Sequence, residues 1–116
     1  MTIYGASQTS GVERRLKVER GGEGIVLTVI DHVGSRERKR IMVQADDLMA
    51  AVTTPPADGI TVAGIAPPHG EAMQLDMQVR GNEVQLTARG GPGAAADVAV
   101  GLDDFMDALG AAVGKG

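Results

Sequence analysis

The sequence predicts an α+β fold in which two ββββα repeats form curved antiparallel sheets packed with two helices, as a pseudo-twofold intramolecular dimer. The first observation behind this prediction is a pattern that occurs twice. Residues 39–52 begin as an alternating strand and continue as an amphipathic helix, and residues 98–109 have the same order. Two acids stand at the expected start of each helix, Asp46–Asp47 and Asp103–Asp104, where an N-cap and the helix dipole favour them. We therefore interpret these acids as helix-capping residues rather than as an acid–base pair.

The second observation is a constant spacing between matching residues. Equivalent residues stand 59 positions apart through the first three strands and 57 positions apart from the fourth strand onwards. The matching pairs are Gly5 and Gly64, Leu16 and Leu75, Gly22 and Gly81, Leu27 and Leu86, Thr28 and Thr87, Val43 and Val100, and Met49 and Met106. This spacing indicates an internal duplication within a single domain of residues 1–116, with repeat one at 1–58 and repeat two at 59–116.

The first repeat is expected to contain four strands and a helix. Its first strand is predicted at 2–6, and its second at 14–20, where apolar and charged residues alternate. The third, at 25–30, is nearly all apolar, as is typical of a strand covered on both faces. The fourth strand is predicted at 39–44, and the helix follows at 46–52.

The second repeat is expected to follow the same order. A strand is predicted at 60–65, and the next two, at 73–80 and 84–89, alternate clearly between apolar and polar residues. A Gly-Asn dipeptide separates those two strands and is a signal for a tight hairpin. The last strand is predicted at 97–100 and the last helix at 102–113.

The composition excludes several classes of protein. The chain has no cysteine, so it has no disulfide, no thiolate metal site and no cysteine nucleophile. It has neither an apolar run long enough to span a membrane nor the apolar core of a signal peptide, so we expect a cytoplasmic protein without a membrane partner. A net charge of −4 argues against a strong, indiscriminate nucleic-acid binder.

No catalytic motif is evident. The two histidines, His32 and His69, lie in expected loops, and neither has a second ligand at the spacing of a metal site. Residues 90–93 are rich in glycine, but no Lys-Ser or Lys-Thr pair follows them to hold a phosphate and magnesium. We therefore expect no catalytic residue, no metal and no cofactor, and a protein that is not an enzyme.

Basic residues are concentrated in the first repeat. Strand alternation places Arg15 and Lys17 on one face of the sheet, and it places Arg38 and Arg40 on the same face. Four cations on one face can follow the phosphates of a nucleic acid. The alternative is a solvated run of charge that keeps the sheet soluble. The candidate nucleic-acid-binding residues are Arg15, Lys17, Thr28, Arg36, Arg38, Lys39, Arg40, Arg80 and Arg89.

The repeated ββββα unit, with Arg40-Ile41-Met42-Val43 leading into Asp46-Asp47-Leu48, resembles the Pur-alpha-like nucleic-acid-binding proteins. It is also similar to the Whirly and transcriptional-coactivator single-strand-binding folds. The resemblance implies that the curved sheet of each repeat presents basic, polar and aromatic side chains to a single strand, while the helices hold the repeats together. The chain departs from this pattern because Tyr4 and Phe105 are its only aromatic rings of Phe, Trp or Tyr and because its second repeat has no basic strand.

These observations predict a small non-enzymatic protein that binds single-stranded DNA or RNA through the basic sheet face of repeat one. The alternative is a protein-interaction or assembly module, including a minimal subunit like that of a sliding clamp. In that case Val26, Ile30 and Met42 would form an apolar docking patch, and the acidic second half would suit a basic partner. The choice between DNA and RNA, a protein partner and a homo-oligomer all stay open at this point.

Overall fold

The chain folds into eight strands and two helices. The structure is a computed structural model, and it describes residues 1–22, 24–53, 59–67, 70–91 and 93–114. In chain order the elements are β1 (Thr2–Ala6), β2 (Glu13–Gly21), β3 (Gly24–Asp31), the 3₁₀ turn η1 (Val33–Ser35), β4 (Glu37–Gln44), α1 (Ala45–Thr53), β5 (Ile60–Ala66), β6 (Glu71–Arg80), β7 (Glu83–Gly90), β8 (Ala96–Gly101) and α2 (Leu102–Gly114). None of the helices in these described ranges is long and apolar enough to cross a membrane.

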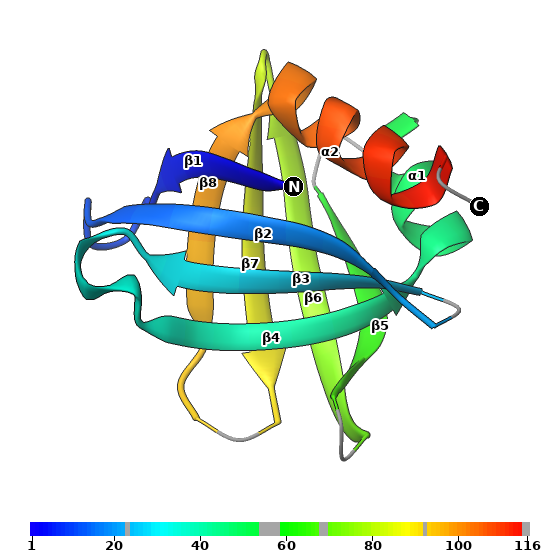
Figure 1. Ribbon diagram of the computed structural model, residues 1–116, viewed down its shortest axis with the longest axis horizontal. Helices are drawn as coiled ribbons and strands as arrows, with labels where there is room; N and C mark the ends of the chain where they lie inside the picture. The colour runs from blue at the N-terminus through cyan, green and yellow to red at the C-terminus, as the bar shows by residue number, and fades with distance from the viewer. Residues whose placement is uncertain (23, 54–58, 68–69, 92, 115–116) are drawn as a thin grey trace.

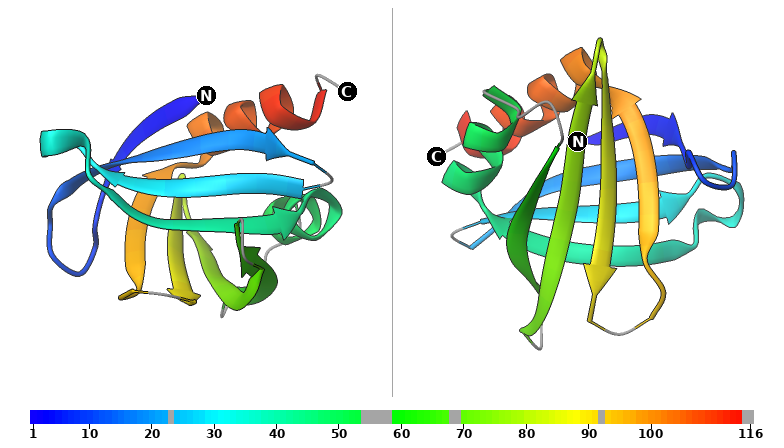
Figure 2. Two further views of the ribbon diagram at one scale, coloured as in Figure 1. Left: turned by 60° about the horizontal axis from the view of Figure 1, so that its bottom comes forward. Right: turned by 180° about the vertical axis from the view of Figure 1, so that it is seen from behind.

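The strands form one closed antiparallel barrel. Each strand pairs with the next in the chain, and β8 pairs with β1 to complete the circle. In Figure 1, β2–β4 run across the front of the barrel and β5–β8 form the wall behind them, which Figure 2 shows from the other side. The predicted α+β class is confirmed, but the predicted pair of separate curved sheets is wrong, since both sets of strands belong to a single eight-stranded sheet.

Closure of the barrel depends on two short strand pairings, β1 with β8 and β4 with β5, which we call seams. Only two residue pairs join β1 to β8, and only two join β4 to β5. Gly5 lies in the first seam and Gly64 in the second. A Cβ atom at Gly5 would overlap the carbonyl oxygen of Ala99, and one at Gly64 would lie 2.7 Å from the carbonyl oxygen of Met42. Both strands can approach their neighbours this closely because glycine has no side chain.

The barrel is filled with aliphatic side chains and is capped at one end by the helices. Alternate residues of the strands point inward, among them Leu16, Leu27 and Leu86, each no more than 2% exposed. Both helices lie at the same end of the barrel, opposite the loops that precede β2 and β4 (Figure 1). From α2, Phe105 and Leu109 are fully buried against this core.

The helices begin two residues earlier than the capping interpretation requires, because an N-cap is the residue before the first helical residue. Since α1 starts at Ala45 and α2 at Leu102, the acids Asp46 and Asp103 lie inside the first turn and are not N-caps. The neighbouring Asp47 also lies in the first turn, where the amide ends of the helix still favour a negative charge. The capping role is therefore wrong, while the electrostatic reason for acids at both helix starts remains.

Substitution of a seam glycine by alanine, compared with that of a helix glycine, tests whether closure of the barrel requires the close approach at the seam. We expect Gly5→Ala to destabilise the protein by roughly 1–3 kcal/mol, because the added methyl group overpacks the seam against β8. Gly110→Ala is the matched control: nothing lies within 4 Å of a Cβ atom there, and alanine favours the helix by roughly 0.5–1 kcal/mol. Urea unfolding measures both; equal stability of the two variants would contradict the role of Gly5.

Candidate functional site

The candidate site is the outer side of the barrel wall formed by β1–β4. The strand register aligns its side chains in cross-strand rows. One row is Tyr4, Arg15, Ile30 and Glu37; the next is Thr2, Lys17, Thr28 and Arg40. Because Leu16 and Ile41 point into the core, their chain neighbours in these rows point outward. We call the surface formed by these two rows the outer face. Three of the predicted binding cations, Arg15, Lys17 and Arg40, meet there.

On the outer face, these cations are held by weak, solvent-exposed interactions. Lys17 Nζ lies 3.6 Å from Glu19 Oε2, and Arg40 Nη2 lies 2.6 Å from Glu37 Oε1. In both ion pairs the side chains are nearly half exposed. Arg15 donates through Nη2 to Ser35 Oγ at 2.7 Å. Exposed ion pairs contribute only about 0–1 kcal/mol, so an incoming anion can replace these carboxylates at little cost.

Two polar atoms of the outer face are buried without a hydrogen bond. They are Thr28 Oγ1 and Arg15 Nε, the two side-chain atoms of this kind in the described part of the chain. Thr28 is only 1% exposed although it points outward, since it lies between Lys17 and Arg40 in its row. A buried polar group without a partner costs roughly 1–3 kcal/mol, so such a group requires an explanation.

An aromatic ring stands at the edge of the outer face. Tyr4 is 66% exposed, and its ring meets that of His32 edge to face, with centroids 5.6 Å apart. A hollow of about 180 Å³ lies beside them and is also lined by Glu13 and Arg14. The exposed face of Tyr4 is thus available next to Arg15. The second histidine, His69, lies outside the described residues.

Two of the predicted site residues lie elsewhere. The register between β3 and β4 shifts after the pair Val29–Lys39, which leaves Arg38 as an extra residue in a β-bulge. Arg38 Nε then reaches Asp31 Oδ2 at 2.6 Å, so the prediction that Arg38 joins Arg15 on the outer face is wrong. Lys39 shares the inward direction of Ile41, is 4% exposed, and donates through Nζ to the Gly93 carbonyl.

The remaining predicted residues are not on the outer face either. Arg36 is an exposed residue of the β3–β4 connection, and its carbonyl accepts from the Asp31 amide. Arg80 is exposed at the end of β6, and Arg89 lies on β7, on the opposite wall of the barrel. Arg89 holds Asp76 through two hydrogen bonds, the shorter of 2.6 Å, which occupies its guanidinium group.

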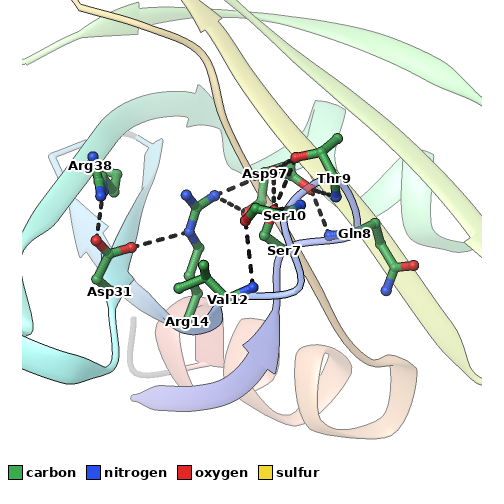
Figure 3. Close-up of polar contacts among 9 residues, drawn as sticks. All are labelled: Ser7, Gln8, Thr9, Ser10, Val12, Arg14, Asp31, Arg38 and Asp97. Carbon is green, nitrogen blue, oxygen red and sulfur yellow. Dashed lines mark hydrogen bonds and ion pairs between the residues drawn. The ribbon is translucent and has the colours of Figure 1, made fainter.

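A polar network closes the end of the barrel away from the helices (Figure 3). Its first centre is Asp31, which accepts from Arg14 Nε at 3.2 Å as well as from Arg38. Arg14 continues to β8, where its Nη1 donates to the Asp97 carbonyl at 2.7 Å. The hydroxyl of Ser7 donates to Asp97 Oδ1, also at 2.7 Å. The arginine therefore links β2, β3 and β8 inside the barrel.

Asp97 is the second centre of this network. Besides Ser7 and Arg14, it accepts from the Thr9 hydroxyl and from the backbone amides of Gln8 and Thr9. These contacts tie the loop after β1 to β8 just beyond the two ladder pairs of their seam. The sequence reasoning missed the role of Asp31 and Asp97. The only signal in the sequence was a single acid near one end of a mostly apolar strand: Asp31 is the last residue of β3, and Asp97 is the second residue of β8.

The network lowers the pKa of both acids. Burial alone would raise the pKa of Asp31, but the hydrogen bonds and charges of Arg38, and then of Arg14, hold it below its usual value of 3.8. Burial likewise acts to raise the pKa of Asp97, and the hydrogen bonds from Ser7, Thr9 and Gln8 outweigh it. On the opposite wall, the pKa of Asp76 is lowered chiefly by the hydrogen bond from Arg89.

No family model, curated protein or solved structure matches this chain. Within the described ranges, no three His, Asp or Glu side chains lie close enough together to hold a metal ion. The interpretation of the outer face therefore rests on its own geometry.

The lowered pKa values predict how stability depends on pH. Since the folded-state values of Asp31 and Asp97 lie below 3.8, their stabilisation is complete above about pH 4 and is lost as pH falls from 3.8 through the folded values. We expect Asp31→Asn to lose about 1.5–3 kcal/mol near neutral pH and to unfold with a shallower dependence on acid. Asp107→Asn, at an exposed position of α2, is the control. Urea unfolding between about pH 6 and pH 2.5 measures this; parallel profiles for Asp31→Asn and wild type would exclude it.

Proposed function

We propose that this protein is a small non-enzymatic binder of single-stranded DNA or RNA that uses the outer face of β1–β4. The observation that carries the proposal is the register that brings Arg15, Lys17 and Arg40 together beside the exposed ring of Tyr4. Cations on a sheet surface follow the phosphates of a strand, and an exposed aromatic ring stacks on its bases.

The weak interactions that hold the cations of the outer face support contact with phosphates. On the outer face, Lys17 and Arg40 are held only by exposed carboxylates, and Arg15 by a serine hydroxyl. Arg14 and Arg38, by contrast, are committed to the network around Asp31. The outer face therefore keeps the cations whose partners an anion can replace most easily.

The repeat architecture is part of the same proposal. Gly11 N donates to Ser7 O and Gly70 N donates to Ala66 O, so an equivalent backbone hydrogen bond follows β1 and β5 at a spacing of 59 residues. The seams also correspond, because Gly5 pairs with Val100 while Gly64 pairs with Val43. These correspondences support an origin in two ββββα units, and with it the resemblance to the Pur-alpha-like and Whirly-like single-strand binders.

A second candidate function is protein docking. It is favoured by an apolar cross-strand row next to the outer face, formed by Val26, Met42 and Ile65. Ile65 is 38% exposed, and a hollow of about 200 Å³ lies along the seam between β4 and β5 at Met42 and Ile65. A partner that docks there would need an apolar surface, and its binding would depend much less on salt than that of a nucleic acid.

Removal of the three cations tests the proposed function. Arg15→Ala, Lys17→Ala and Arg40→Ala together should weaken binding of a labelled oligothymidylate measured by fluorescence anisotropy. The log–log dependence of the binding constant on salt should become less steep by about 0.7 for each lost phosphate contact. Wild-type binding should be modest in affinity and strongly dependent on salt, because Tyr4 is the single exposed aromatic ring among Phe, Trp and Tyr.

The matched control removes the same charge elsewhere. The triple variant Arg20→Ala, Arg80→Ala and Arg89→Ala changes net charge equally. It leaves the outer face intact, because Arg20 lies near the end of β2 opposite Ile25, outside the two rows, and the other two arginines lie on β6 and β7. Its salt dependence should stay close to wild type. No binding by wild type at low salt, or equal loss in the two triple variants, would exclude nucleic-acid binding on this face and favour protein docking.

Tyr4 provides an independent test. Tyr4→Leu should weaken oligonucleotide binding by about 1–3 kcal/mol, the range for loss of one stacked base, without changing the salt dependence. Tyr4→Phe keeps the ring and should bind like wild type. Because the side chain is 66% exposed, neither variant should alter unfolding in urea appreciably. Equal binding by the Leu and Phe variants would remove stacking on Tyr4 from the proposal.

A further inference from the structure

We propose that Thr28, Lys17 and Arg40 form a binding site for one phosphate group, in which the Thr28 hydroxyl donates to a phosphate oxygen. This inference deepens the proposed function and rests on it for the identity of the ligand as a nucleic-acid strand. The site lies in the middle of the outer face, in a single cross-strand row. Phosphate oxygens are strong acceptors, and hydrogen bonds to them are reinforced where the donors are charged.

The hydroxyl group of Thr28 is buried and unsatisfied. Thr28 is 1% exposed, and its Oγ1 makes no hydrogen bond with any described residue. Position 28 needs a β-branched residue for the strand, and valine would supply the same shape without a polar atom to bury. The hydroxyl therefore destabilises the free protein at this position, and a ligand that accepts a hydrogen bond from it would remove that cost.

Two basic side chains flank the Thr28 hydroxyl. Lys17 and Arg40 stand directly opposite Thr28 on the two neighbouring strands, where Cβ atoms are about 4.5–5.5 Å apart. The two side chains are flexible and are 46% and 47% exposed. Their charged ends are turned to exposed carboxylates of their own strands. When both ends turn to a phosphate, the hydroxyl beneath them becomes accessible to the same group.

The other wall of the barrel has a matching threonine in an acidic row. Thr87 stands 59 positions after Thr28. Like Thr28, it is the middle residue of a cross-strand row, in this case on β7 between β6 and β8. Its direct neighbours on the adjacent strands are Asp76 and Asp97. Acidic residues therefore flank Thr87, whereas the basic residues Lys17 and Arg40 flank Thr28. The same scaffold position is thus surrounded by opposite charge in the two walls, and only the row of Thr28 suits an anion.

Three threonine variants test the site. Thr28→Val removes the hydroxyl and keeps the shape, Thr28→Ser restores a hydroxyl, and Thr87→Val is the matched control on the opposite wall. Each is titrated with a labelled oligothymidylate, with its uncharged methylphosphonate analogue, and with inorganic phosphate followed by the amide NMR signals of β3. Thermal unfolding of each variant reports on folding.

We expect Thr28→Val to unfold at or above the wild-type temperature and yet to bind the phosphodiester oligonucleotide about tenfold or more weakly, the loss typical of a hydrogen bond to a charged group. Thr28→Ser and Thr87→Val should bind like wild type, and the methylphosphonate should not distinguish Thr28→Val from wild type. Equal binding of both charged probes by Thr28→Val and wild type would overturn the site while leaving the proposed function in place.

The remaining outcomes separate the two proposals. Binding of inorganic phosphate that depends on Thr28, without any binding of the oligonucleotide, would support the phosphate site and assign it to a small phosphorylated ligand. It would exclude the single-strand function. Failure of the wild-type protein to bind either charged probe would overturn both proposals.

Discussion

Closure of the barrel is the constraint on which the rest of the structure depends. Between β1 and β8 the ladder contributes only two residue pairs, too few to hold the ends of the sheet together without other contacts. Asp97 supplies those contacts, since it accepts from two hydroxyls, two backbone amides and the Arg14 guanidinium group. A closed barrel leaves no long strand edge exposed for pairing with other chains. By stabilising closure, the Asp97 carboxylate therefore also protects these strand edges from such pairing.

The same network decides which basic residues are available to a ligand. Arg14 is needed inside the barrel to join Asp31 with Asp97, and the bulge in β4 commits Arg38 to the same acid. Lys39 is buried and donates to the Gly93 carbonyl in the connection between β7 and β8. The fold therefore divides the basic residues of positions 36–40 into three kinds. Arg38 and Lys39 are structural, Arg36 is exposed in the connection before β4, and Arg40 lies on the outer face, where the proposed binding would use it.

The sequence predicted local structure well, because alternation and glycine signals are local properties. The strands around Leu16, Leu75 and Leu86 follow their apolar patterns closely. Closure was not predictable, since it depends on Gly5 meeting β8 at the far end of the chain and on Gly64 joining β5 to β4 across the intervening helix α1. The bulge at Arg38 was also out of reach, because it is a property of the register with β3. The inward direction of Lys39, by contrast, followed from its parity with the apolar residues of β4 and could have been inferred.

The two seams also give a physical reason for the opposite charges around the two central threonines. The seam between β4 and β5 is bridged by the chain itself, which continues through α1, so no side chain has to clamp it. The seam between β1 and β8 joins the first strand to the last and needs Asp97 for closure. Under the proposed duplication, Arg40 is the counterpart of Asp97 at a spacing of 57 residues. Position 97 must therefore be an acid for stability, whereas position 40 is free of that demand and can carry the positive charge that an anion requires.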